Sequence, residues 1–77
     1  MTGRQPTRVR NRIRDLRQQA DEMTQQSLAD SVGVTRQTIN AIEQGKYSPT
    51  LEAAFRISRV FGATLDQVFY YEDSDGG

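Results

Sequence analysis

The sequence predicts an all-α fold built from five short helices. Three observations lead to this prediction. Apolar residues recur every three to four positions along most of the chain, as they do on one face of a helix. Each of the expected helices has a threonine or asparagine placed to cap its first turn. Three are followed by a glycine, the residue that most readily adopts the positive φ of a helix end.

The first helix is expected after residues 1–7, a polar segment that has no hydrophobic period and should be flexible. One apolar stripe then recurs at spacings of four, three and four residues and comprises Val9, Ile13, Leu16 and Ala20. Thr7 or Asn11 could cap this helix. The first helix is expected to end at Asp21 and Glu22, with no glycine after it.

Two short helices joined by a tight turn are expected within residues 25–45. Thr24 and Thr35 are placed to cap them, Gly33 lies in the turn, and Gly45 follows the second helix. The residues expected on their buried sides are Leu28, Ala29, Val32, Ile39 and Ile42.

The last two helices follow a loop at residues 47–49, where proline disfavours a helical conformation in the residue before it. Thr50 is placed to cap the fourth helix and Gly62 to end it. Its expected buried face comprises Leu51, Ala54, Phe55, Ile57, Ser58 and Phe61. Thr64 is placed to cap the fifth helix, with Leu65, Val68 and Phe69 inside.

The composition narrows the class of protein. A chain of 77 residues is expected to form one domain, with no separate catalytic or effector-sensing domain, so no small-molecule effector is expected. The absence of cysteine and histidine excludes disulfides and the usual metal sites, and no cofactor is expected. No apolar run is long enough for a membrane span or a signal peptide, so we expect a cytoplasmic protein.

The charge is distributed unevenly although the formal net charge is +0. Residues 1–61 contain all ten basic groups and six of the acidic ones, a net charge of +4. Residues 72–77 form an acidic tail that we expect to be disordered. Local charge, and not the sum, determines whether a surface attracts phosphate. The basic part could bind an anionic partner or could be an ordinary solvated face.

Residues 25–45 have the spacing of a helix-turn-helix, a motif whose second helix enters the major groove of DNA. Counted from Gln25, the small Ala29 is fifth, at the point where the two helices cross. Gly33 is ninth, in the turn, where a positive φ has no Cβ penalty. Ile39 and Ile42 are fifteenth and eighteenth and would anchor the second helix.

The outer face of that second helix carries the candidate base-reading residues Arg36, Gln37, Thr38 and Asn40. Arginine contacts guanine and glutamine contacts adenine through paired hydrogen bonds, and a threonine methyl can contact thymine. Elsewhere such residues would be interpreted as a solvated helix face; within this motif we interpret them as DNA readers. The candidate phosphate-binding residues are Gln25, Thr35, Gln44, Lys46 and Tyr47. Tyr47 could equally be a packed loop residue.

Phe69, Tyr70 and Tyr71 form an aromatic run that also favours a β-strand. One interpretation is a dimer contact, through strand pairing with residues 8–10. The other is that Phe69 completes the core and the two tyrosines simply lie on the surface.

The segment TQQSLADSVGVTRQTINAIEQGKYSPTLEAAFRISRVFGATLDQVF resembles the lambda-repressor-like Xre group of helix-turn-helix regulators. The resemblance runs from Arg12 to Phe69 and is closest to minimal single-domain members. It implies a five-helix, lambda-repressor-like DNA-binding domain at residues 8–71 that binds double-stranded DNA. It also implies a homodimer with two recognition helices on a near-palindromic operator.

The resemblance further implies that Glu43 forms a structural ion pair with an arginine of the first helix, here Arg17. Two features depart from the family pattern. The linker at residues 20–24 lacks the usual glycine and is one residue longer, and Ser27 replaces a glutamate that would complete a capping box.

The leading function is therefore a sequence-specific transcriptional regulator, most simply a repressor that occludes polymerase. The alternative is an antitoxin or other protein-interaction module with secondary DNA binding, in which the tyrosines and the tail contact a protein. An enzyme is not expected, because the acidic residues are scattered and no catalytic set or phosphate loop is present.

Overall fold

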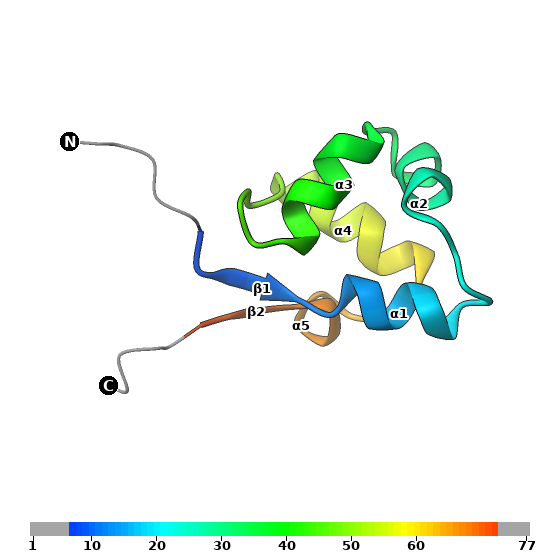
Figure 1. Ribbon diagram of the computed structural model, residues 1–77. Coiled ribbons are helices and arrows are strands. Elements are labelled where there is room, and N and C mark those ends of the chain that lie inside the picture. The colour runs from blue at the N-terminus through cyan, green and yellow to red at the C-terminus, as the bar shows by residue number, and fades with distance from the viewer. Residues whose placement is uncertain (1–6, 73–77) are drawn as a thin grey trace.

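The computed structural model describes residues 7–72, and within them the chain forms five helices and two strands (Figure 1). The elements in chain order are β1 (Val9–Asn11), α1 (Ile13–Gln19), α2 (Gln25–Val32), α3 (Arg36–Glu43), α4 (Leu51–Val60), α5 (Leu65–Val68) and β2 (Phe69–Tyr71). Apart from Thr7 and Glu72, the predicted flexible N-terminus and acidic tail lie outside the described residues.

The predicted five helices are present, but the all-α class requires a correction. β1 and β2 form a two-stranded antiparallel sheet in which Val9 lies opposite Tyr71 and Asn11 opposite Phe69. Figure 1 shows the two strands side by side at one end of the helical body. The β-favouring aromatic run does pair with residues near 8–10, but the pairing joins two ends of the same chain.

The sheet also moves the start of the first helix. The apolar stripe placed Val9 on this helix, whereas the structure assigns Val9 to β1 and starts α1 at Ile13. Asn11 still contributes to the helix start, because its Oδ1 accepts a hydrogen bond from the Ile13 N–H (3.1 Å). After α1, Asp21 and Glu22 adopt positive φ values of 60° and 55°. The chain thus turns there without glycine.

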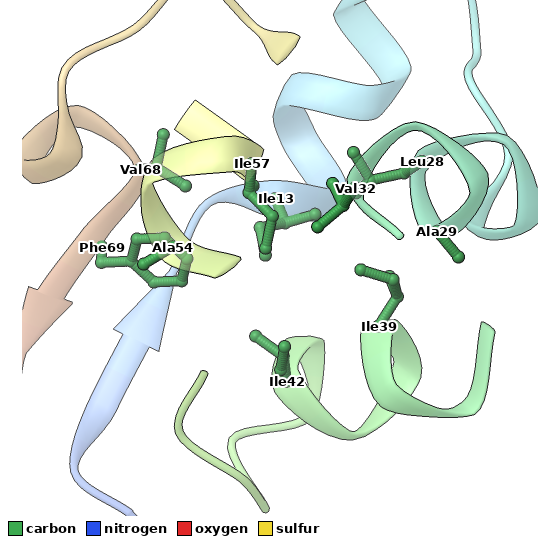
Figure 2. Close-up of a cluster of buried hydrophobic side chains, with 10 residues drawn as sticks. All are labelled: Ile13, Leu28, Ala29, Val32, Ile39, Ile42, Ala54, Ile57, Val68 and Phe69. Atoms are coloured by element: carbon green, nitrogen blue, oxygen red, sulfur yellow. The ribbon is translucent and has the colours of Figure 1, made fainter. Parts of the chain in front are cut away.

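The core is one cluster of apolar side chains from every helix and from β2. The residues that the helix-turn-helix spacing predicted to be buried are all buried. Figure 2 shows Ile39 and Ile42 pointing from α3 toward Ile13 and Val32. The remaining buried apolar residues are Leu28, Ala29, Ala54, Ile57, Val68 and Phe69.

The buried face of α4 differs from the prediction. Leu51 and Phe55 are 66% and 49% exposed, whereas Ala54, Ile57 and Ser58 are buried. Ala53, Val60 and Phe61 are partly buried beside them, so the core-facing side of α4 is turned away from Leu51 and Phe55. The buried Ser58 hydroxyl satisfies its hydrogen bond by donating to the Ala54 carbonyl (2.9 Å).

The predicted threonine caps of α2, α3 and α4 are formed in the structure. The hydroxyls of Thr24, Thr35 and Thr50 each accept a hydrogen bond from the backbone N–H three residues later. At α5, the Thr64 hydroxyl donates to the Asp66 carboxylate (2.7 Å), and this bond lowers the pKa of Asp66 below its usual value. No helix within residues 7–72 has the length and apolar character that a membrane crossing requires.

Candidate nucleic-acid interface

The turn between α2 and α3 sets the angle of the second helix. Gly33 has φ +88°, and the N–H groups of Gly33 and Val34 both donate to the Ala29 carbonyl (2.8 and 3.0 Å). Ala29 is fully buried, which allows α3 to pack closely against α2. The turn therefore depends on a glycine at one end and a small side chain at the crossing.

Replacing Gly33 by alanine should lower the free energy of unfolding by about 1–2 kcal/mol, because an L-residue is strained at this positive φ. Urea unfolding followed by circular dichroism measures the change. Ser31→Ala is the matched control, since Ser31 is exposed near the end of the same helix. Equal stabilities for the two variants would contradict this role for Gly33.

Burial of Ile39 and Ile42 directs the opposite side of α3 outward. Both isoleucines are essentially inaccessible, and Arg36 and Gln37 are exposed at the N-terminal end of the helix. Thr38 is partly buried and shares a hydrogen bond with the Thr35 hydroxyl (3.0 Å). Of the predicted base-reading residues, Arg36 and Gln37 are thus exposed, whereas Thr38 and Asn40 are partly buried on the two flanks of the helix.

A shallow hollow beside this face brings several of the predicted residues together. It is lined by Thr35, Gln37, Thr38, Ala41 and Tyr47. Tyr47 is 47% exposed, so its ring is not a core residue. Lys46 is also exposed, immediately beyond the end of α3. Tyr47 therefore borders the outer face of α3, and Lys46 is exposed in the loop that follows the helix.

A second hollow lies on the other flank of α3, and its lining residues are Arg14, Arg17, Gln25, Asn40, Glu43 and Gln44. The Gln25 amide nitrogen lies 3.2 Å from both Asn40 Oδ1 and Glu43 Oε1. The nitrogen of Gln44 lies 3.2 Å from the same Asn40 oxygen. Four predicted site residues, three of them candidate DNA contacts and the fourth Glu43, are therefore joined in one network.

This network competes with the phosphate contact that was expected of the Gln25 side chain. The two hydrogens of its amide nitrogen are used by Asn40 and Glu43. The side-chain amide is therefore engaged inside the protein, and a phosphate at the start of α2 would be met by backbone N–H groups.

Arg17 and Glu43 lie in direct contact. Arg17 Nε is 2.7 Å from Glu43 Oε2, and Arg17 Nη2 is 3.1 Å from Glu43 Oε1. Their side chains are only 14% and 8% exposed. Arg17 also donates to the Met23 carbonyl (2.8 Å), so the longer linker is tied to the same guanidinium. The extra linker residue leaves the Arg17–Glu43 contact in register.

The three aromatic residues near the C-terminus divide into two groups. Phe69 is 8% exposed and belongs to the core, so it is not an exposed dimer contact. Tyr70 and Tyr71 are 46% and 66% exposed. The Arg12 guanidinium lies over the Tyr70 ring, 4.5 Å from its centroid.

Sequence reasoning did not identify the support that β1 provides to α3. The Asn11 amide donates to the Ile42 carbonyl (2.8 Å), near the end of α3. Arg10 packs so closely on Gly45 that an added Cβ would lie 2.8 Å from its Nη1, and Arg10 pairs with Glu72 (2.6 Å). These contacts come from β1, whereas the apolar stripe had placed Val9 on the first helix.

Comparison with known proteins agrees with this geometry. The model of the helix-turn-helix family HTH_3 matches residues 13–68. The chain is 51% identical, over 69% of its length and 80% of the relative, to an uncharacterized HTH-type transcriptional regulator of Methanocaldococcus jannaschii. It is 33% identical to the cryptic phage CTXphi transcriptional repressor RstR of Vibrio cholerae, over 75% of this chain and 51% of RstR.

The fold also matches a solved structure, that of a putative DNA-binding protein from Bacteroides fragilis. The TM-score is 0.70, and the match covers 80% of this chain and 98% of the other at 21% sequence identity. Similarity at this level of identity concerns the fold alone. It agrees with the arrangement of helices described above.

Proposed function

This chain belongs to the helix-turn-helix family HTH_3 of Xre-like transcriptional regulators, and we propose that it is a repressor that binds a near-palindromic operator as a homodimer. Its DNA-binding unit is the helix-turn-helix of α2 and α3. In the proposal α3 lies in the major groove, with Arg36, Gln37 and Asn40 toward base edges.

One observation carries the proposal for α3. The helix is anchored by two inaccessible isoleucines, while its exposed N-terminal residues are Arg36 and Gln37. This is the end of a recognition helix that normally meets base edges, and these side chains can form paired hydrogen bonds with guanine and adenine. Tyr47 borders the same face and Lys46 follows the helix in an exposed loop, and both are proposed to hold the DNA backbone.

Repression is the simplest regulatory outcome for such a domain. A protein bound across a promoter excludes polymerase without contacting it, so no activating surface is needed. RstR, a repressor by name, supports this choice among the relatives.

The test is selection of duplexes from a random pool at fixed salt, repeated with Gln37→Ala. The proposal predicts an inverted repeat for the natural chain and a relaxed preference at one position of each half-site for the variant. Salt-sensitive binding with no preferred sequence would contradict base reading.

The proposed homodimer would match the two-fold symmetry of the operator. Two exposed apolar surfaces are candidates for the contact: Tyr70 and Tyr71 on β2, and Leu51 and Phe55 on α4. Both pairs are large side chains that a monomer leaves in water, and aromatic residues are enriched at interfaces.

The dimer prediction is tested by sedimentation equilibrium of the natural chain and of two double variants. Leu51→Ser with Phe55→Ser, or Tyr70→Ser with Tyr71→Ser, should yield monomers and weaken operator binding at least tenfold through loss of the linked second site. A natural chain that is monomeric both alone and on the operator would contradict the homodimer.

A further inference from the structure

We infer that Asn40 is held as a hydrogen-bond donor toward DNA and that Gln25 and Glu43 determine this orientation. The inference rests on the proposed function, since it names the kind of base atom that Asn40 contacts. An asparagine side chain carries one oxygen acceptor and one nitrogen donor group on a nearly symmetric amide. Its neighbours therefore decide which of the two faces a ligand.

The orientation is determined by a series of hydrogen bonds that begins at a charged group. The Arg17 guanidinium can only donate, and it engages both carboxylate oxygens of Glu43 (2.7 and 3.1 Å). An ionised carboxylate can only accept. The group of Gln25 that lies 3.2 Å from Glu43 Oε1 must therefore be its amide nitrogen.

The same reasoning extends from Gln25 to Asn40. The Gln25 nitrogen that donates to Glu43 also lies 3.2 Å from an atom of the Asn40 amide. That atom has to accept a hydrogen bond, so it is the carbonyl oxygen. Gln44 donates to the same oxygen, also at 3.2 Å. Both acceptor positions of the Asn40 oxygen are thus occupied within the protein.

The remaining group of Asn40 is its NH₂, which can only donate. Asparagine reads adenine by two bonds at once, accepting from the N6 amino group and donating to N7. With the carbonyl oxygen engaged by Gln25 and Gln44, only the donating half of this pair is available. Asn40 should therefore select base acceptors, namely guanine O6 or N7, thymine O4 or adenine N7, and disfavour the N4 amino group of cytosine.

The first experiment locates and probes the base that Asn40 reads. Operators are selected with the natural chain and with Asn40→Ala, and the position whose preference the variant loses is identified. Guanine or thymine there supports the inference. If the base is adenine, two modified operators are compared with the natural one. An operator with a purine that lacks the 6-amino group at this position should bind with an affinity within about twofold of the natural operator. An operator with 7-deazaadenine there should bind about tenfold or more weakly.

Three results would overturn the inference while leaving the proposed function intact. They are a preferred cytosine at this position, an adenine whose 6-amino group matters as much as its N7, and an Asn40→Ala variant that changes no position. Failure to select any sequence with the natural chain would instead remove the proposed function, and this inference with it.

The second experiment tests Gln25 as a positioning residue. Gln25→Ala should free the Asn40 amide to turn, so the preference at the Asn40 position alone should relax to admit bases that present an amino group. Gln26→Ala is the matched control, because Gln26 is exposed on the same helix and its amide donates to Asp30 (2.9 Å). An unchanged preference in folded Gln25→Ala would overturn the role of Gln25.

A variant of Asn40 itself provides an independent test that does not depend on the folding of Gln25→Ala. Asn40→Asp keeps an oxygen for Gln25 and Gln44 but replaces the outward donor by an acceptor. Selection with this variant should shift the position toward cytosine or adenine, which present amino groups. Retention of the original base by Asn40→Asp would contradict donor-only reading.

Discussion

Glu43→Ala should lower the free energy of unfolding by about 3–5 kcal/mol, because it leaves a nearly buried guanidinium without its partner. Arg17 and Glu43 are 14% and 8% exposed and are joined by two hydrogen bonds. Removing the carboxylate also leaves Gln25 without one of its acceptors. Since small domains have total stabilities of only about 5–15 kcal/mol, this loss is a large fraction of the total, and the variant should unfold at a much lower urea concentration than the natural chain.

Urea unfolding followed by circular dichroism measures this effect, and Glu52→Ala provides the comparison. Glu52 also pairs with an arginine, Arg56 (3.0 Å), but its side chain is 76% exposed. The loss of that exposed pair should change the free energy of unfolding by less than about 0.5 kcal/mol. If the two variants unfold at the same urea concentration, Glu43 does not brace α3 in the way described.

Arg36→Ala should weaken operator binding about 5- to 150-fold, the range for one paired contact to guanine. Binding to duplexes without the operator should fall much less, because there only the charge of Arg36 contributes. Arg36→Lys separates the two contributions: it keeps the charge but cannot form the planar paired contact, so it should lose most of the specificity. Fluorescence anisotropy at fixed salt measures both affinities.

Lys46→Ala is the contrasting variant for this measurement. A phosphate contact carries no sequence information, so its loss should weaken operator and non-operator binding to a similar degree. It should also reduce the salt slope, log Kd against log salt concentration, by about 0.9. If Arg36→Ala weakened both kinds of DNA equally, as expected for Lys46→Ala, the assignment of Arg36 to base reading would be wrong.

The sequence was sufficient for the helices and the centre of the core. The threonine caps depend on local spacing, and the buried pair Ile39 and Ile42 follows from the helical period, so both were predictable. Val9 was placed on a helix because its spacing fits that period, while its actual partner, Tyr71, lies at the other end of the chain. The β-favouring run at residues 69–71 was recognised and its pairing with residues 8–10 was considered, but as a contact between two chains. That the two segments pair within one chain depends on the folded arrangement and cannot be read from local spacing.

The site was predictable to a similar extent. The outer face of α3 follows from which residues are buried, and Arg17 was paired with Glu43 through family resemblance. The engagement of Gln25 by Asn40 and Glu43 could not be predicted, because it depends on how α1, α2 and α3 approach one another in space. The support of α3 by Asn11 was missed for the same reason.

The central claim is that the outer face of α3 lies in the major groove, and site-specific cross-linking tests it most directly. The chain contains no cysteine, so Gln37→Cys introduces a single thiol on this face. Asp66→Cys is the control, since Asp66 is exposed on α5, which lies across the core from α3 (Figure 1).

The partner in this measurement is an operator that carries a thiol tethered to the major-groove edge of one base. The account predicts that Gln37→Cys forms a disulfide with a base at one position of each half-site and that Asp66→Cys forms none. Cross-linking of both variants to the same extent, or of Gln37→Cys only to a thiol in the minor groove, would contradict it.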